Sequence, residues 1–100
     1  MRVLFICNQN IHRSRTAEEL FKNRFETLSA GLYNEHPVTE KQISWADTIV
    51  VMEEEQRMEL VKRFPNLMMS KRLICFDVPD AYSYQQPELV ELLKSKAVLL

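Results

Sequence analysis

Short apolar segments alternate with amphipathic segments along the whole chain. Four segments are rich in β-branched or aromatic residues and too short for helices, which is typical of buried strands: 2–6, 26–30, 48–52 and 72–76. Between and after them, apolar residues recur with helical spacing: 14–25, 39–46, 53–64 and a last helix from Pro87. This alternation predicts an α/β fold with three layers. We expect a four-stranded parallel sheet in the order 2-1-3-4, with helices on both faces.

The helical spacing also predicts which side chains face the core. In the helix 14–25, Lys22 and Arg24 are expected in the last turn, matching the helix dipole. In the helix 53–64, Pro65 is expected to act as the stop. The inward-facing residues of the three longer helices are expected to be Ala17, Leu20, Phe21 and Phe25; Met58, Val61 and Phe64; and Leu89, Leu92, Leu93 and Ala97.

The composition is that of one globular domain. Hydrophobic residues make up 46% and charged residues 27% of the 100 residues, which is enough to bury a core. The net charge of −1 argues against nucleic acid or an acidic membrane as a partner. The apolar run 3–6 is too short for a signal peptide or a membrane span, and Cys7 and Cys75 lack the spacing of a disulfide framework or a zinc site. We expect a cytoplasmic protein, whose oligomeric state the sequence leaves open.

Three loops meet at one edge of the predicted sheet. In open parallel sheets, ligands bind beyond the carboxyl ends of the strands, near the switch in strand order. The loops expected at this edge are 7–13, the start of the segment from Glu53, and 77–84. Their convergence predicts the position of the functional site.

The first of these loops has the form Cys-x5-Arg, between a strand and a helix. Its backbone N–H groups can curl into an anion nest, to which the helix N-terminus adds positive charge. These donors and Arg13 favour the thiolate form of Cys7, and the guanidinium can grip two phosphoryl oxygens. Ser14 is placed to cap the helix, and its hydroxyl is also able to donate to the sulfur. The other residues expected to form this phosphate-binding loop are Asn8, Gln9, Asn10, Ile11 and His12.

The chain resembles the low-molecular-weight protein tyrosine phosphatase family. That family opens with a strand, a Cys-x-Gly-Asn-x-x-Arg-Ser loop and a helix beginning near an Ala-Glu pair. The residues that fall in register here are Cys7, Asn10, Arg13, Ser14, Ala17 and Glu18. Ser29-Ala30-Gly31 and the segment 45–52 are similar to the end of the family's second strand and to its third strand. The likeness covers residues 1–100 as a single, shortened domain.

Two departures from the family pattern affect the expected pocket. Gln9 stands where the family has the loop glycine, although Asn10 can still supply a left-handed turn. The connection between the second and third strands is also shorter than in the family. We expect part of the pocket wall to be missing or rebuilt.

The resemblance implies a general acid in the loop 77–84. The family carries this acid in an Asp-Pro-Tyr motif, which Asp80 matches with Ala81 in place of the proline. Such an acid protonates the leaving oxygen and then activates water. Asp77 lies nearer the strand end and is expected to be structural. Tyr82 and Tyr33 are expected to contact the substrate, with Tyr84 a weaker candidate.

Other residues invite a catalytic interpretation that we do not favour. His12 is expected to point to solvent or pack locally rather than act as a base. Glu53-Glu54-Glu55 complements a helix dipole and is not expected to bind a metal. Cys75 lies within a strand, which makes it a poor disulfide relay, so an arsenate reductase is the less favoured reading of the same fold.

The sequence therefore predicts a cysteine-dependent phosphomonoester hydrolase with a phosphocysteine intermediate. The expected substrate is a phosphotyrosine protein or a small aryl phosphate ester. Two alternatives stay open: a non-catalytic module that binds phosphate or phosphopeptide, and a cysteine phosphoryl carrier. No metal or other cofactor is expected, because the loop and Arg13 supply the positive charge.

Overall fold

The computed structural model describes all residues, 1–100. The elements follow in the order β1 (Arg2–Cys7), α1 (Arg13–Phe21), β2 (Glu26–Gly31), α2 (Glu40–Trp45), β3 (Thr48–Val51), α3 (Glu54–Arg63), α4 (Pro65–Met68), β4 (Arg72–Cys75) and α5 (Pro87–Lys96), with a 3-10 turn at Ala97–Leu99. None of these helices has both the length and the apolar character needed to span a membrane.

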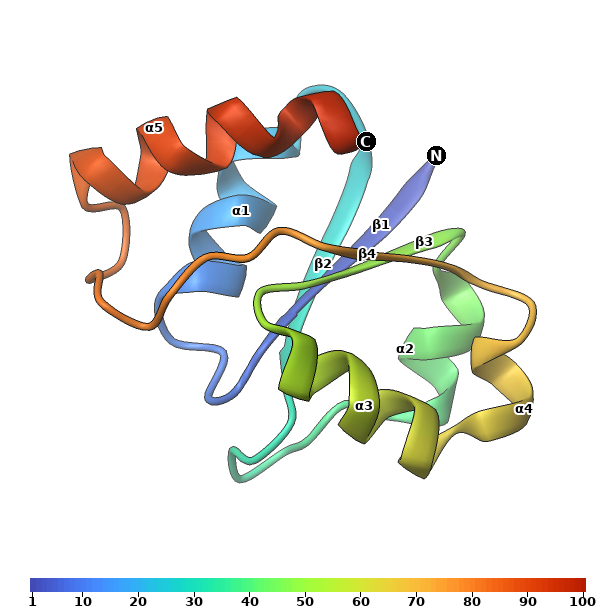
Figure 1. The fold of residues 1–100 in the computed structure, drawn as a ribbon. Helices are drawn as coiled ribbons and strands as arrows, with labels where there is room; N and C mark the ends of the chain where they lie inside the picture. The colour runs from blue at the N-terminus through green and yellow to red at the C-terminus, as the bar shows by residue number, and fades with distance from the viewer.

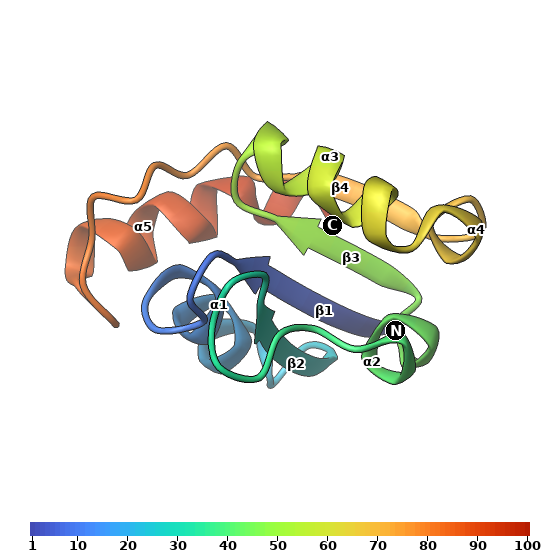
Figure 2. The same ribbon diagram turned by 90° about the horizontal axis from the view of Figure 1, so that it is seen from below.

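The four strands form one parallel sheet in the order β2-β1-β3-β4. Helices α1 and α5 cover one face, and α2, α3 and α4 cover the other (Figure 1). The predicted fold class, strand order and layers are confirmed. Figure 2 shows β1 and β3 pointing toward the same end of the sheet, beside the segment that leads from β4 to α5. The loops predicted to converge at this edge therefore do so.

The central strand β1 divides the core into two halves. Its side chains alternate, so Val3, Phe5 and Cys7 face α1 and α5. Leu4 and Ile6 face the opposite helices, and all four residues from Val3 to Ile6 are fully buried. Burying such side chains stabilises the fold by about 1.5–3 kcal/mol each. The loop after β1 thus follows directly from a strand that is buried on both faces.

Helix α1 begins earlier and ends earlier than predicted. The carbonyl of Phe21 accepts from the N–H groups of both Arg24 and Phe25, at 3.0 and 3.1 Å, and this closes the helix. Lys22 and Arg24 therefore lie beyond the last turn and not within it, because the chain turns back to enter β2 at Glu26. The predicted inward face is otherwise right, since Ala17 and Phe21 are buried and both Leu20 and Phe25 pack against them.

The predicted inward face of α3 is wrong at Met58 and Val61 and right at Phe64, which packs against the core beneath α2, α3 and α4. Met58 is 71% exposed and Val61 is 46% exposed, whereas Gln56 and Leu60 are buried. The helix is rotated because the polar side chain of Gln56 is required at the turn from β3, where it accepts two backbone N–H groups. Pro65 does not only end α3, since it is also the first residue of the short helix α4.

Three residues other than glycine have a positive φ. They are Asn10 at 55°, Asp77 at 55° and Gln85 at 57°. Asn10 lies in the loop after β1, and the other two lie in the connection from β4 to α5. Left-handed backbone is therefore confined to the two loops that meet at the functional edge.

Candidate active site

The sulfur of Cys7 is held by groups from its own loop. The Oγ of Ser14 lies 2.9 Å from the Sγ of Cys7, and the backbone N–H of Asn10 donates to the same sulfur at 3.2 Å. The Ser14 Oγ also lies 2.7 Å from the Asn10 Oδ1. The positive φ of Asn10 turns the backbone so that its N–H faces the sulfur. The sulfur is therefore fixed in position by a backbone N–H and a hydroxyl group of its own loop.

Ser14 does not cap α1, contrary to expectation. His12 is the N-cap residue and makes no side-chain cap. Ser14 lies within the first turn with its side chain fully buried. Its hydroxyl is already occupied by Cys7 and Asn10, so it is unavailable to the helix N-terminus.

Arg13 is a buried cation, with 2% of its surface exposed. Its Nη1 donates to the Glu53 carboxylate and, at 2.8 Å, to the backbone carbonyl of Val78. Its Nε lies 3.9 Å from Oδ1 of Asp80, beyond hydrogen-bond distance. The guanidinium is thus fixed by one nitrogen. The Nε and Nη2 edge has no hydrogen-bond partner and has the geometry that grips an oxyanion with two parallel bonds.

A buried glutamine connects the loop after β1 to the turn after β3. The Oε1 of Gln56 accepts from the N–H groups of Met52, at 2.7 Å, and Glu53, at 3.0 Å. Its Nε2 donates to Oδ1 of Asn8 at 3.0 Å. One side chain therefore positions both the carboxylate that holds Arg13 and the first residue after Cys7.

The end of β2 supports the same loop from the other side. The carbonyl of Asn8 accepts from the N–H groups of Leu32 and Tyr33, at 3.0 and 2.9 Å. A Cβ at Gly31 would lie 3.0 Å from this carbonyl and 2.6 Å from Oδ1 of Asn34. The chain's single glycine is therefore placed where the backbone of the loop packs most closely against its neighbour.

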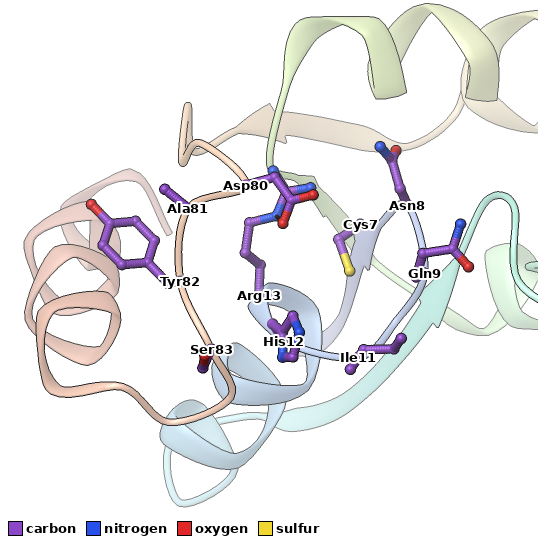
Figure 3. Close-up of a pocket in the computed structure, with 10 residues that line it drawn as sticks. All are labelled: Cys7, Asn8, Gln9, Ile11, His12, Arg13, Asp80, Ala81, Tyr82 and Ser83. Atoms are coloured by element: carbon purple, nitrogen blue, oxygen red, sulfur yellow. Dashed lines mark ion pairs between the residues drawn. The ribbon is translucent and has the colours of Figure 1, made fainter.

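A cavity of about 480 Å³ opens above Cys7 and Arg13. Figure 3 shows these two side chains next to each other, with Asp80 over the guanidinium and Gln9 on the opposite rim from Tyr82. The residues that line the cavity are Cys7, Asn8, Gln9, Ile11, His12, Arg13, Asp80, Ala81, Tyr82 and Ser83. Two loops that are far apart in the sequence thus form its two sides.

The loop after β4 contributes Asp80 and Tyr82 to the cavity but not Asp77. The side chain of Asp80 is 64% exposed. Tyr82 is half-buried against the core beneath α1 and α5, and Figure 3 shows its ring directed away from Cys7.

Three of the predicted site residues do not line the cavity. Asn10 and Ser14 lie beneath it, against the sulfur. Tyr33 is 55% exposed, and the Arg63 guanidinium lies 5.1 Å from the centre of its ring.

Sequence reasoning missed two residues that hold this site. Glu53 was assigned to the helix dipole, whereas its carboxylate binds Arg13. Gln56 was assigned no role from the sequence, although it is only 2% exposed. The available signal was a glutamine at the third position of a helix that starts at the carboxyl edge of the sheet.

The second cysteine lies on the other face of the sheet. Cys75 packs against the core beneath α2, α3 and α4, whereas Cys7 belongs to the opposite core. Burial raises the pKa of the Cys75 thiol above its ordinary value. No three His, Cys, Asp or Glu side chains lie close enough together to hold a metal ion.

The strand order, together with a cysteine loop between β1 and α1, gives this protein the fold of the low-molecular-weight protein tyrosine phosphatases. One similar structure is the low molecular weight phosphotyrosine phosphatase VcLMWPTP-2 from Vibrio cholerae O395, with a TM-score of 0.80 and 21% identity over 98% of this chain and 92% of that chain. The tyrosine phosphatase AmsI from Erwinia amylovora has a TM-score of 0.78 and 20% identity, over 97% of this chain and 88% of that chain. The arginine phosphatase YwlE from Geobacillus stearothermophilus has a TM-score of 0.76 and 19% identity, over 98% of this chain and 86% of that chain. The sequence itself matches no protein-family model and no curated protein. The predicted resemblance is thus confirmed at the level of the fold.

Proposed function

We propose that this protein hydrolyses phosphate monoesters through a phosphocysteine intermediate on Cys7. The observation that carries the proposal is the setting of that sulfur. It lies beside a buried arginine in a cavity, with Ser14 Oγ and the Asn10 N–H directed at it. The fold is one in which the similar structures named above are phosphatases.

In the first step, the Cys7 thiolate attacks the phosphorus atom in line with the ester oxygen. An S–P bond forms as the P–O bond to the leaving group breaks. The Nε and Nη2 of Arg13 bind two phosphoryl oxygens, and the backbone N–H groups of the loop bind the charge that develops. Asp80, in its protonated form, gives its proton to the leaving oxygen.

In the second step, water displaces the cysteine. The Asp80 carboxylate accepts a proton from the water as its oxygen attacks phosphorus. The S–P bond breaks, and inorganic phosphate and the Cys7 thiolate are released. The Ser14 hydroxyl, 2.9 Å from the sulfur, donates to the thiolate as it leaves.

The favoured substrate is an aryl phosphate, either phosphotyrosine in a protein or a small ester. The cavity above the anion site is lined in part by Ile11, Ala81 and Tyr82, whose apolar surfaces suit an aromatic ring better than a charged group. The fold by itself does not decide this point, since tyrosine and arginine phosphatases both share it.

The test is release of 4-nitrophenol from 4-nitrophenyl phosphate in chelator and reductant. We expect turnover by the wild-type protein that is lost in Cys7→Ser and retained in Cys75→Ser, because only Cys7 lines the cavity. Folded, reduced protein without turnover would refute the proposal. If that protein bound phosphate or phosphopeptide, it would be a binding module; if a donor protein phosphorylated Cys7 stably, it would be a phosphoryl carrier.

A further inference from the structure

Backbone hydrogen bonds hold the segment that carries Asp80 at its two ends and not between them, where only the Tyr82 side chain packs against the core. At the near end, the Val78 N–H donates to the Met52 carbonyl at 2.8 Å, and the Val78 carbonyl accepts from Arg13. Residues 79–82 make no backbone hydrogen bond to the rest of the protein. The position of Asp80 therefore depends on how firmly each end is fixed.

The far end is fixed to the first turn of α1 by two hydrogen bonds. The Tyr84 N–H donates to Nδ1 of His12 at 3.0 Å, across 72 residues of sequence. The Gln85 N–H donates to Oγ1 of Thr16 at 2.9 Å. His12 belongs to the cysteine loop and Thr16 lies in α1 just beyond it, so the segment with Asp80 is attached to the loop that holds Cys7 and Arg13.

His12 is well placed to act as a fixed acceptor. It immediately precedes Arg13, and its own carbonyl accepts from both the N–H and the hydroxyl of Thr16, at 3.0 and 2.7 Å. Its ring lines the cavity on the side of Ser83, as Figure 3 shows. The lone pair of Nδ1 is directed at the Tyr84 N–H. An occupied Nδ1 is not free to take a proton from water.

We propose that His12 is a positioning residue that fixes the general acid, acting through the backbone of Tyr84. This inference rests on the proposed function, because it assigns Asp80 the role of proton donor. His12 need not touch the reacting atoms. Without its acceptor, the Tyr84 N–H loses its protein partner. The far end of the segment then keeps the backbone bond from Gln85 to Thr16 and the contact of the Tyr84 ring with the Arg15 guanidinium, 5.4 Å from the ring centre.

The first test compares leaving groups. A nitrophenolate departs with little help from an acid, whereas the more basic phenolate needs a proton. We expect His12→Ala to lower kcat/KM about tenfold for phenyl phosphate but no more than about twofold for 4-nitrophenyl phosphate, because kcat/KM reports the first step and not the shared hydrolysis of phosphocysteine. Inhibition by inorganic phosphate should change less than kcat/KM for phenyl phosphate, since Arg13 and the backbone N–H groups of the loop are kept.

The conservative variant His12→Asn tests whether the acceptor atom Nδ1 is what matters at this position. In His12→Asn, Oδ1 is attached to Cγ just as Nδ1 is in histidine, so the acceptor is kept at the same distance along the side chain. We expect this variant to recover most of the phenyl phosphate activity. The chain's other histidine, His36, is exposed and does not line the cavity, so His36→Ala is the matched control and should match the wild type.

A double variant tests whether His12 acts through Asp80. In an Asp80→Asn background, His12→Ala should cause little further loss, because the proton donor is already gone. An equal loss in both backgrounds, or an equal loss for both substrates, would overturn the inference.

The contact itself can be tested without turnover. Amide hydrogen exchange at Tyr84 should be faster in His12→Ala and should return toward the wild-type rate in His12→Asn. Unchanged exchange in His12→Ala would refute the anchoring contact. Failure of the proposed function would instead appear as wild-type protein without Cys7-dependent turnover, whatever the exchange rates.

Discussion

The two sides of the cavity are built in opposite ways. On the side of the cysteine loop, Arg13 and Ser14 are buried and their polar atoms are held by several partners. On the side of the acid loop, the Asp80 side chain is 64% exposed and its nearest ion-pair partner is 3.9 Å away. Anion binding is preorganised by the core, whereas proton delivery depends on a segment whose backbone is hydrogen-bonded to the rest of the protein only at its ends.

This difference implies that binding and proton transfer can be damaged separately. A change beneath the cysteine loop disturbs a buried, connected network, so it should affect stability and activity together. A change in the acid loop should affect activity alone. The following predictions test this separation.

The largest effect is expected from Arg13→Lys. A lysine keeps the charge but loses the planar fork that meets Glu53 and two phosphoryl oxygens. We expect kcat/KM for 4-nitrophenyl phosphate to fall at least about a thousandfold, and the free energy of unfolding to fall by about 2 kcal/mol. Steady-state kinetics measure kcat/KM, and urea denaturation measures the free energy of unfolding. A kcat/KM within tenfold of wild type would show that Arg13 is not the phosphate ligand.

Asp80→Asn should separate activity from stability. The carboxyl that donates the proton is removed, so we expect kcat for phenyl phosphate to fall about a hundredfold. The side chain is mostly exposed, so the free energy of unfolding should change by less than about 0.5 kcal/mol. Asp77→Asn is the matched control, because asparagine tolerates the positive φ at that position. If Asp77→Asn lost more activity than Asp80→Asn, the two aspartates would have to exchange roles.

Gln56→Leu should weaken the cysteine side chiefly through stability. It leaves the buried N–H groups of Met52 and Glu53 without their acceptor. We expect the free energy of unfolding to fall by about 2–3 kcal/mol in urea denaturation. Gln56→Glu keeps an acceptor for these groups, and at low pH its protonated carboxyl also keeps a donor toward Asn8, so it should be the less damaging change there. Equal losses in both variants at neutral pH, where the carboxylate lacks that donor, would place the main role of Gln56 at Asn8.

The smallest effect concerns the cysteine on the other face. Burial raises the pKa of Cys75, so its thiol should ionise at higher pH in the folded protein than in the unfolded chain. The pH dependence of iodoacetamide alkylation, measured in Cys7→Ser with and without urea, reports this shift. Below the ordinary thiol pKa, the free energy of unfolding should not depend on this group. As the pH rises from there through the folded-state pKa, the free energy of unfolding should decrease. An alkylation profile unaltered by urea would contradict it.

The fold could be predicted because it follows from short-range patterns. The apolar segments that became β1 and β3 are buried on both faces, and their separation by helices leaves few topologies. The loop after β1 was also recognisable, since Cys7 and Arg13 lie close in sequence. Helix ends were less predictable, because α1 ends where the chain must turn into β2.

The supporting contacts could not be predicted because they join distant segments. Gln56 contacts Asn8 across 48 residues, and His12 contacts Tyr84 across 72. The one local signal at Gln56 was its place at the third position of a helix that starts at the carboxyl edge of the sheet. The rotation of α3 that places Met58 outward follows from the two backbone N–H groups that Gln56 accepts at the turn from β3, which helical spacing alone does not reveal.

The positive φ angles of Asn10, Asp77 and Gln85 limit how this protein could be made more heat-resistant. Left-handed backbone costs a residue other than glycine roughly 1 kcal/mol or more, least for asparagine and aspartate, so Gln85→Gly offers a direct gain in stability. Gln85, however, is the residue next to Tyr84, and its N–H is one of the two donors that attach the acid loop to the start of α1. A glycine at this position would make that attachment more flexible. Selection for thermal tolerance and selection for turnover would therefore favour different residues at this position.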